Sequence, residues 1–281
     1  MLIASWNVNS IRSRLEQVIN WLIATNADVL CLQETKVIDK EFPFESFERL
    51  GYQVKVYGQK SYNGVAIISK SDIENVKFGF LDEIEGDETI DYLETQKRII
   101  SAIVNGVRII NIYVPNGSSI PSDKFDFKID WLKNFKKYIS AQQQRNELTC
   151  ITGDFNIAPT DQDIHAPESY RNKIMASELE RKMLEDIVKG RFIDSFRVFE
   201  KNSGFWSWWD YRNRAFDLNK GWRIDHIYIC NGLLPKLKSA VIQRSERGNT
   251  KPSDHAPVII NLDLDKNDQN FEDEDDDFFL L

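Results

Sequence analysis

The sequence lacks the features that mark several common functional classes. It has no apolar run approaching the ~18 residues of a membrane span, and its start, MLIASWNVN, has neither a basic leader nor a small-residue cleavage site. Glycine-rich phosphate loops, CxxC pairs and a serine elbow are also absent. We therefore expect no membrane association, no secretion signal and a cytoplasmic location, at the nucleoid if the source is bacterial.

Cysteine is scarce, and basic charge is outweighed only at one end of the chain. Cys31, Cys150 and Cys230 are odd in number and lie in apolar stretches, which predicts reduced core thiols. The net charge is −8, but residues 265–281 (DKNDQNFEDEDDDFFLL) contain eight acidic residues and one lysine. Residues 1–264 are thus nearly neutral, with 35 basic and 36 acidic residues. A polyanionic partner is compatible with such a body where basic side chains gather locally.

Strand-like runs recur along the chain. They predict strands at 2–8, 28–33, 53–58, 65–69, 98–104, 107–114, 148–155, 223–230 and 257–264. Helical periodicity predicts helices over 13–25, 122–145 and 177–189, with capping boxes at Ser13–Glu16 and Ser177–Glu180 and a stop at Gly190. Since no linker separates two halves, we expect one α/β domain over residues 1–264, with stacked sheets flanked by helices.

Polar side chains follow many of these apolar strands. CITGDFNIAP (150–159) ends with Asp154 and Asn156, which an extended chain points to the same side. Other strand ends supply similar residues: Asn7 and Asn9, Gln33 and Glu34, Tyr113 and Asn116, Asp225, and Asp254 with His255. One such end is explained by a cap or a turn. Six of them indicate a site at one rim of a sheet.

The chemistry of these residues favours a divalent cation. Glu34, Asp154, Asp225 and Asp254 are carboxylates, which need partners or a metal when they are buried. No thiolate accompanies them, and oxygen-rich ligation suits Mg²⁺ or Mn²⁺ rather than zinc. The residues alone therefore predict a metal-dependent hydrolase that acts on a phosphate ester.

The three histidines have different surroundings. His255 adjoins an acid in a turn between two prolines, which predicts a functional imidazole held at a fixed angle. His226 directly follows Asp225, and strand alternation turns it to the opposite side, so we expect a structural role. His165 lies in the loop TDQDIHAPE, where it could line the site or lie on the surface.

Residues 205–223 (FWSWWDYRNRAFDLNKGWR) combine four tryptophans and three other aromatic residues with four basic residues. Aromatic side chains are mostly buried, so a core role is the simpler interpretation. Consecutive Trp208 and Trp209 cannot, however, both face inward from a strand. At least one of them is expected to contact a ligand or a neighbouring loop.

Seven segments occur in the order and approximate spacing of a known family. They are SWNVNSIRSR, LCLQETK, YNGVAI, NIYVPNG, GDFNIAP, WRIDHIY and KPSDHAPV. Over residues 1–264 the sequence resembles the exonuclease III family of apurinic/apyrimidinic (AP) endonucleases, within the endonuclease/exonuclease/phosphatase superfamily. The resemblance implies a DNase I-like fold, a four-layer α/β sandwich of two packed sheets flanked by helices, with the site at one edge of both sheets.

The resemblance also implies roles for the residues at the strand ends. The implied metal ligands are Glu34 foremost, with Asn7, Asp254, Asp154 and Asn156, and the cofactor is Mg²⁺ with Mn²⁺ as a substitute. The implied catalytic residues are Tyr113, Asp154, Asn156, Asp225 and His255. Asp154 would activate or position the attacking water, while Asn156 and Tyr113 hold phosphate oxygens. His255, oriented by Asp225, would contact the scissile phosphate. The number of metals and the identity of the general base stay open.

The implied substrate is double-stranded DNA with abasic or 3′-blocked sites. The resemblance predicts cleavage 5′ to an abasic site to leave a 3′-OH, with 3′-5′ exonuclease and 3′-end cleaning activities, by a monomer. Phe205, Trp208 and Trp222 match a pocket for a flipped-out abasic sugar. Candidate DNA contacts are Asn116, Lys97, Arg98, Arg212, Arg214 and Lys251. The alternatives are a related enzyme acting on 3′-blocked ends or a small phosphoester, and a non-enzymatic DNA-binding module.

Two regions depart from the family pattern. Asn9 stands where some members have aspartate, which leaves the metal site less charged and favours the bacterial branch. Residues 265–281 are an acidic tail, predicted to be disordered, with four apolar residues at its tip. Its layout is similar to the tails by which single-stranded DNA-binding proteins recruit partners. We expect it to bind a repair or replication protein, or to fold back onto the chain's own DNA groove.

Overall fold

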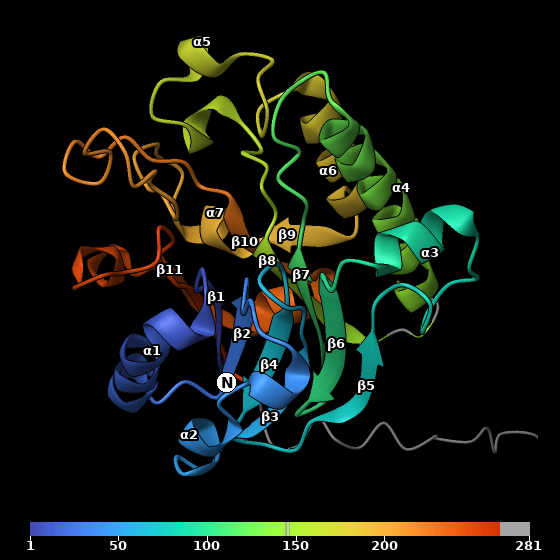
Figure 1. The fold of residues 1–281 in the computed structure, drawn as a ribbon, viewed down its shortest axis with the longest axis vertical. Helices are drawn as coiled ribbons and strands as arrows, with labels where there is room; N and C mark the ends of the chain where they lie inside the picture. Colours follow the sequence, from blue (N-terminus) through green and yellow to red (C-terminus); the bar gives the residue numbers. More distant parts are fainter. Residues whose placement is uncertain (144, 146, 265–281) are drawn as a thin grey trace, which may run out of the picture.

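Two β-sheets form the centre of the computed structural model, which describes residues 1–143, 145 and 147–264 (Figure 1). The first sheet contains β1 (Leu2–Asn7), β2 (Val29–Gln33), β3 (Gln53–Tyr57), β4 (Val65–Ser69), β11 (Leu237–Ile242) and β12 (Val258–Leu262). Its strand order is β11–β12–β1–β2–β4–β3. Strands β1 and β2 are parallel, and the other neighbours are antiparallel.

The second sheet repeats this plan. It contains β5 (Glu74–Phe78), β6 (Ile99–Val104), β7 (Val107–Tyr113), β8 (Leu148–Asp154), β9 (Phe192–Asp194) and β10 (Asp225–Cys230), in the order β5–β6–β7–β8–β10–β9. Strands β7 and β8 are parallel, and the remaining pairs are antiparallel. Each sheet therefore has a central parallel pair whose carboxyl ends lie side by side, which is where ligand sites form in such sheets.

Helices cover the outer face of each sheet, and a shared core fills the space between the sheets. On the first sheet, α1 (Ile11–Thr25) and α2 (Phe44–Glu48) pack on residues such as Trp6 and Leu30. On the second, α3 (Glu88–Glu94), α4 (Asp123–Gln143) and α6 (Glu178–Val188) cover Ile110 and Ile151. Between the sheets, Ile3 and Cys31 meet Ile109 and Cys150. The result is the predicted four-layer sandwich (Figure 1).

The remaining elements are short. They are α5 (Pro167–Tyr170), α7 (Ser195–Phe199) and the 3₁₀ turns η1 (Asp39–Glu41), η2 (Asp161–Asp163), η3 (Asn231–Lys236) and η4 (Arg244–Gly248). All three cysteines are free, as predicted, with Cys31 and Cys150 buried and Cys230 half-buried. Among the described residues, no helix has both the length and the apolar character needed to cross a membrane.

Three strands were not predicted, and all three are sheet edges. Strands β5, β9 and β11 lie at the ends of the two strand orders. Their burial is partial: β5 has no buried residue, and β11 alternates irregularly around a register shift between Leu237 and Ser239. An edge strand packs on one side only and need not be strongly apolar, so the hydrophobic pattern that identifies inner strands is weak there.

The predicted start of the first helix is wrong, while that of α6 is confirmed. Helix α1 begins at Ile11 rather than behind a Ser13–Glu16 capping box. The cause is tertiary: the N–H groups of Ser10 and Ile11 donate to the carbonyls of Glu34 and Thr35, at 2.8 and 3.2 Å. These bonds replace a local side-chain cap and tie α1 to the loop after β2. For α6, Ser177 and Glu180 form the reciprocal capping box that was predicted.

Candidate active site

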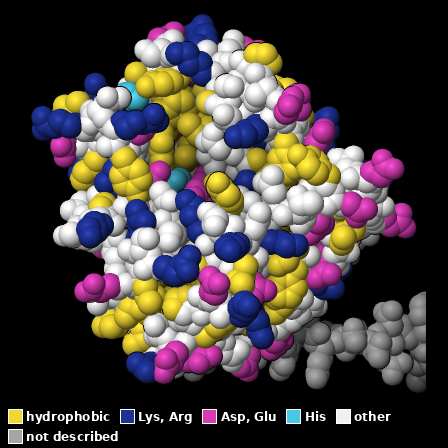
Figure 2. Space-filling view, viewed as in Figure 1, with side chains coloured by type: hydrophobic (Ala, Val, Ile, Leu, Met, Phe, Trp, Pro, Cys, Tyr) yellow, Lys and Arg dark blue, Asp and Glu magenta, His cyan; other side chains and the backbone are white. Residues whose placement is uncertain are grey.

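The polar strand-end residues lie together at one rim of the two sheets. Asn7 and Asp154 end β1 and β8, and Glu34 directly follows β2. The antiparallel register places Asp225, the first residue of β10, opposite Asp154. His255 precedes β12 and forms a bridge with Trp208. Figure 2 shows a hollow on this side of the molecule, with histidine and acidic side chains in its floor and Lys and Arg side chains around it.

Glu34 is held by donors from three directions. The Asn7 amide donates to Glu34 Oε1 at 2.9 Å, and the Tyr113 hydroxyl donates to the same oxygen at 2.8 Å. Lys36 forms an ion pair with Glu34 Oε2 at 2.7 Å. Burial alone would raise the pKa of Glu34, but Lys36 and the Asn7 hydrogen bond lower it. Glu34 is therefore ionised and fixed in place at neutral pH. Lys36 was not predicted as a site residue, although it stands in the segment QETK.

Asp154 lies at the centre of the group. Its Oδ2 accepts hydrogen bonds from the amides of Asn7 at 2.9 Å and Asn156 at 3.1 Å, and its Oδ1 accepts from the backbone N–H of Asn156 at 2.9 Å. Burial raises the pKa of Asp154 to about 7, with the Asp225 and Glu34 carboxylates adding to the effect and His255 opposing it. A carboxylate of raised pKa is a stronger base near neutral pH.

His255 and Asp225 form a buried pair beside Asp154. His255 Nδ1 lies 2.8 Å from Asp225 Oδ2, and His255 Nε2 lies 3.8 Å from Asp154 Oδ2. Burial alone would lower the pKa of His255, but the carboxylates of Asp225 and Asp154 raise it to about 10. The imidazole is therefore protonated at neutral pH. Its Nδ1–H is used by Asp225, which leaves Nε2–H directed at the Asp154 side of the hollow.

Asp254 belongs to a separate group at the side of this centre. Its Oδ1 accepts from the amide of Asn9, and its Oδ2 accepts from the indole N–H of Trp208, both at 3.0 Å. Asn9 in turn accepts from Lys36 at 2.5 Å, so these contacts continue to Glu34. Both oxygens of Asp254 are thus engaged by the protein, and Asn9, a departure from the family pattern, acts here as a donor to a carboxylate.

The donor set fits a hard divalent cation. Within the described part of the chain, Asp154, Asp225 and His255 present ligand atoms within 4.8 Å of one another. Asp225 Oδ1 is buried and has no hydrogen-bond partner, and a buried bare carboxylate oxygen needs a cation or a donor. Glu34 lies outside that trio but shares the Asn7 amide with Asp154. The prediction that Glu34, Asn7, Asp254, Asp154 and Asn156 are ligands stays a prediction.

The three aromatic residues predicted for a sugar pocket are not all together. Trp208 and Trp222 form a two-stranded bridge with reciprocal backbone bonds of 2.9 Å. Phe205 instead packs on Phe196, with ring centroids 5.8 Å apart, and is 41% exposed. The Trp208–Trp209 prediction is confirmed, since Trp209 is fully buried while the half-buried Trp208 contacts Asp254.

The candidate DNA contacts occupy three kinds of position. Arg98 is buried, lies 4.4 Å from the ring of Tyr113 and donates to the Tyr113 carbonyl, and Lys97 lies 4.5 Å over the ring of Tyr57. Arg212, Arg214 and Lys251 are exposed, the first two in ion pairs with Asp210 and Asp217. Asn116 is also exposed and donates to Asn156 Oδ1 at 2.9 Å. Arg98 therefore contacts both the ring and the backbone of Tyr113 and helps to fix the position of that residue.

The other two histidines also have defined places. His226 is fully buried and contacts the Ile157 carbonyl through Nε2 at 2.9 Å, on the face opposite Asp225. Burial and the nearby Arg223 lower the pKa of His226 to about 4, so it is neutral, in keeping with a structural role. His165 packs on Tyr170, whose ring lies 4.9 Å from that of Trp222.

A buried ionic network supports the aromatic segment and allows a stability prediction. Asp163 accepts from Arg223 at 2.7 Å and Arg197 at 2.6 Å, and Arg223 also pairs with Asp194. Burial alone would raise the pKa of Asp163, but the Arg223 and Arg197 guanidinium groups lower it to about 2. A lowered pKa means that this contribution, about 2.5 kcal/mol, is complete above about pH 5 and is lost as the pH falls towards 2.

Replacing Asp163 by Asn should therefore reduce the free energy of unfolding at pH 7 by about 3 kcal/mol, because it leaves Arg223 partly unpaired in the interior. Urea unfolding of both proteins at pH 7 and pH 3 measures this effect. The stability gap between wild type and variant should shrink at pH 3, since the unfolded wild-type chain, in which this carboxyl has its ordinary pKa, is then mostly protonated while the folded one is not. An equal gap at both pH values would contradict the assigned ion pair.

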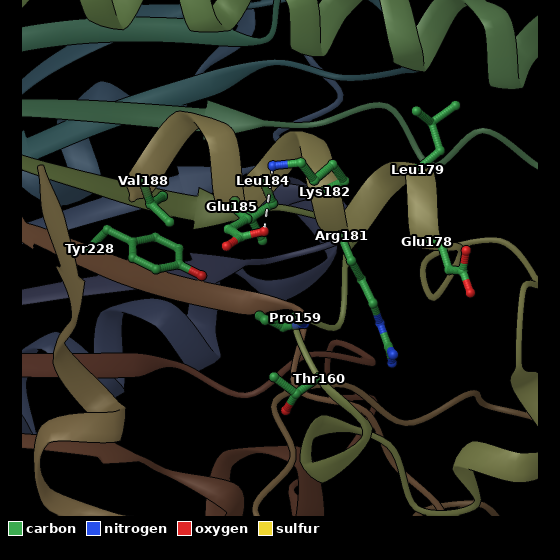
Figure 3. Close-up of a pocket in the computed structure, with 10 residues that line it drawn as sticks. All are labelled: Pro159, Thr160, Glu178, Leu179, Arg181, Lys182, Leu184, Glu185, Val188 and Tyr228. Atoms are coloured by element: carbon green, nitrogen blue, oxygen red, sulfur yellow. Dashed lines mark ion pairs between the residues drawn. The ribbon is translucent and has the colours of Figure 1, made fainter. Parts of the chain in front are cut away.

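A groove of about 780 Å³ lies elsewhere, on the outer side of the second sheet (Figure 3). It runs between α6 and β10, and its lining includes Pro159, Leu179, Leu184, Val188 and Tyr228. None of the polar strand-end residues lines it. The groove is therefore separate from the candidate active site.

Both the sequence and the fold of this chain are similar to those of known proteins. The sequence matches the endonuclease/exonuclease/phosphatase family over residues 4–255. It is 33% identical over 270 residues to exodeoxyribonuclease III of Haemophilus influenzae, covering 92% of this chain and 98% of that protein. The 3′ phosphatase NExo from Neisseria, solved bound to a product DNA hairpin, has a TM-score of 0.88 at 36% identity, covering 94% of this chain and 100% of that one. An AP endonuclease from Archaeoglobus fulgidus has a TM-score of 0.87 at 36% identity, with the same two coverages. This chain therefore belongs to the endonuclease/exonuclease/phosphatase family, in its exonuclease III branch.

Proposed function

We propose that this chain is a DNA-repair AP endonuclease that hydrolyses the phosphodiester 5′ to an abasic site and leaves a 3′-OH, with 3′-5′ exonuclease and 3′-end cleaning activities. The observation that carries the proposal is the buried group in which His255 lies 2.8 Å from Asp225 and 3.8 Å from Asp154, beside an ionised Glu34. The names of its relatives, an exodeoxyribonuclease III, a 3′ phosphatase and an AP endonuclease, support nuclease chemistry on DNA.

The buried group divides the work of phosphodiester hydrolysis between an acceptor and a donor. Asp154 accepts or orients the proton of the attacking water, for which its raised pKa suits it. His255 donates from Nε2 to a phosphate oxygen on which negative charge develops, while Asp225 holds the other ring nitrogen. Tyr113 donates to Glu34 and so orients that carboxylate. The amide of Asn156 has both N–H groups engaged, by Asp154 and the Val114 carbonyl, so its first task is to hold Asp154.

Glu34 is the proposed principal ligand of a Mg²⁺ ion, with Mn²⁺ as a substitute. Asn7 and Asp154 are proposed to complete the protein ligands near it, and Asp254 and Asn156 to be further contacts. When bound, the cation would neutralise charge on the scissile phosphate. The fit rests on carboxylate oxygens, among them the buried Asp225 Oδ1 that has no hydrogen-bond partner, and not on His255, whose two ring nitrogens both carry protons.

The proposed substrate is double-stranded DNA. Trp208 and Trp222 at the edge of the polar group, with the exposed Arg212, Arg214 and Lys251, are proposed to contact it. Phe205 remains a candidate only through the family resemblance, because it packs on Phe196. We also propose a monomer in the cytoplasm. A protein partner of the acidic tail is a proposal about residues 265–281, which lie outside the described residues.

A second candidate function is hydrolysis at 3′-blocked ends as the main reaction. The observation that favours it is the packing around Trp222, which is 4% exposed and has the ring of Tyr170 4.9 Å away. A flipped-out abasic sugar needs room beside such a ring. If this packing persists with DNA bound, terminal phosphoesters are the better substrates.

The deciding experiment uses the purified full chain and two DNA duplexes. One carries a single abasic analogue, and the other carries a 3′-phosphate. With Mg²⁺ we expect one nick 5′ to the analogue, and addition of EDTA should reduce cleavage to background, because charge neutralisation at the phosphate is lost. Phosphate release from the second duplex without a nick in the first would favour the second candidate. No reaction on either duplex would contradict both.

A further inference from the structure

Lys128, on the inner side of α4, brings a fully buried cation close to the active site. Its ammonium forms an ion pair with Glu180 of α6, and neither side chain is exposed to solvent. The same nitrogen donates to the carbonyl of Asn156 at 2.8 Å and to the carbonyl of Asn116 at 3.2 Å. All three ammonium hydrogens therefore have acceptors, two of them in the loops that follow β7 and β8.

Glu180 binds Lys128 and also fixes the start of α6. Its Oε1 accepts from Lys128 and from the backbone N–H of Met175, and its Oε2 accepts from the N–H and the hydroxyl of Ser177. Its neighbour Arg181, which reaches from α6 towards the Pro159–Thr160 segment in Figure 3, donates to the Ala158 carbonyl at 3.0 Å. Helix α6 therefore holds the chain at two places. Arg181 bonds Ala158 shortly after β8, and Glu180 bonds Met175 and Ser177 just before the helix.

Asn156 connects the Lys128–Glu180 pair to Asp154. Its backbone has a φ of +48°, a conformation that few residues other than glycine and asparagine adopt readily. In that conformation its backbone N–H and its amide bond the two oxygens of Asp154, at 2.9 and 3.1 Å. Lys128 holds the carbonyl of this same residue, so its ammonium is two hydrogen bonds away from the proposed water-activating carboxylate.

We propose that Lys128 and Glu180 are a pair of positioning residues that hold Asn156 in its left-handed conformation and thereby keep Asp154 aimed at the attacking water. The proposal rests on the function proposed above, since it assigns the pair to that reaction. The pair also links Met175, in the loop before α6, to the same point. One buried ion pair would then hold both the proposed base and the loop before α6.

A buried ion pair is a costly way to gain stability alone, because apolar residues of similar size often serve as well or better. What apolar residues cannot do is donate hydrogen bonds. Bringing the carbonyls of Asn116 and Asn156 to one point requires a compact donor with several hydrogens, which an ammonium provides. Buried positioning partners of active groups typically change rates by about 10- to 100-fold when they are removed.

The test compares two double variants that remove a charged pair without leaving an unpaired ion. Lys128→Met with Glu180→Gln removes the proposed positioning pair. Arg108→Met with Glu147→Gln removes a pair with an equally buried cation near the start of β7, five residues from Tyr113 along the strand. We expect kcat on the abasic duplex to fall about 10- to 100-fold in the first variant, with KM within about threefold. In the control, kcat should stay within about twofold even where Tm falls. A first variant that is folded and has kcat within twofold of wild type, or changes only KM, would overturn the proposal.

A crystal structure of the Lys128→Met, Glu180→Gln variant tests the same idea without any reaction. Asn156 should leave its positive φ and lose at least one of its bonds to Asp154. An unchanged Asn156 would overturn the inference, whatever the activity. Failure of the wild-type protein to cleave DNA would instead overturn the proposed function and leave this geometric result interpretable.

Discussion

Replacing Asp154 by Asn is expected to lower kcat on the abasic duplex by about 10³-fold, with little change in KM. The amide cannot accept a proton from water, and removing such a group typically costs about 10²–10⁴ in rate. The surroundings add to the loss. Asn7, the Asn156 amide and the Asn156 backbone all donate to this side chain, so the NH₂ group of the new amide would meet a donor at whichever oxygen it replaced.

Single-turnover cleavage at saturating enzyme measures this effect, because it separates chemistry from product release. Asp28→Asn is the matched control. Asp28 precedes β2 at the opposite rim and accepts from the Leu2 backbone N–H at 2.7 Å, so it is also a carboxylate bonded to a strand end. That variant should retain wild-type kcat within about twofold. Retention of more than about a tenth of the activity by Asp154→Asn would remove Asp154 from the role of base.

The position of this carboxylate could be predicted because it depends on local sequence. Cys150, Ile151 and Thr152 predict a strand inside a sheet, and the polar residues after it lie at the rim, as expected. Alternation, however, is not what brings Asp154 and Asn156 together. Asn156 has left the strand conformation, with a φ of +48°, and it reaches back to Asp154 through both its backbone and its side chain. Asp154 and Asn156 are neighbours as predicted, but the turn at Asn156 that brings them together was not predicted.

Other parts of the site depend on contacts across the fold, which a single sequence does not reveal. Lys128 lies on the predicted helix α4, but its partners are 12, 28 and 52 residues away. Lys36 was visible in the segment QETK, but its contacts to Glu34 and Asn9 depend on the turn after β2. Conversely, the family resemblance implied that Phe205 lines the sugar pocket with Trp208 and Trp222. The structure instead packs Phe205 on Phe196, a contact that the sequence did not predict.

The relation of His255 to Asp225 gives the second large expected effect. The two residues are 30 positions apart in the sequence, but His255 Nδ1 lies 2.8 Å from Asp225 Oδ2. We therefore expect them to act as one unit. Replacing His255 by Ala removes the proposed donor to the charged transition state and should lower kcat by about 10³-fold. Replacing Asp225 by Asn keeps the shape but can offer an N–H instead of an acceptor to Nδ1. We expect a loss of about 10²-fold, since the imidazole then loses its orientation and its proton is less strongly held.

The double variant distinguishes one unit from two independent groups. If Asp225 acts only through His255, then His255→Ala with Asp225→Asn should be no slower than His255→Ala alone, and the two effects on the activation free energy will not add. Additive losses would mean that Asp225 has a task of its own, for which its unpartnered Oδ1 is the available atom. His226→Gln is the control for Asp225→Asn. His226 follows Asp225 on β10, is equally buried and is turned to the opposite face of the sheet. The kcat of His226→Gln should stay within about twofold of wild type, which would tie the loss at position 225 to the carboxylate that faces His255 and not to a general weakening of β10.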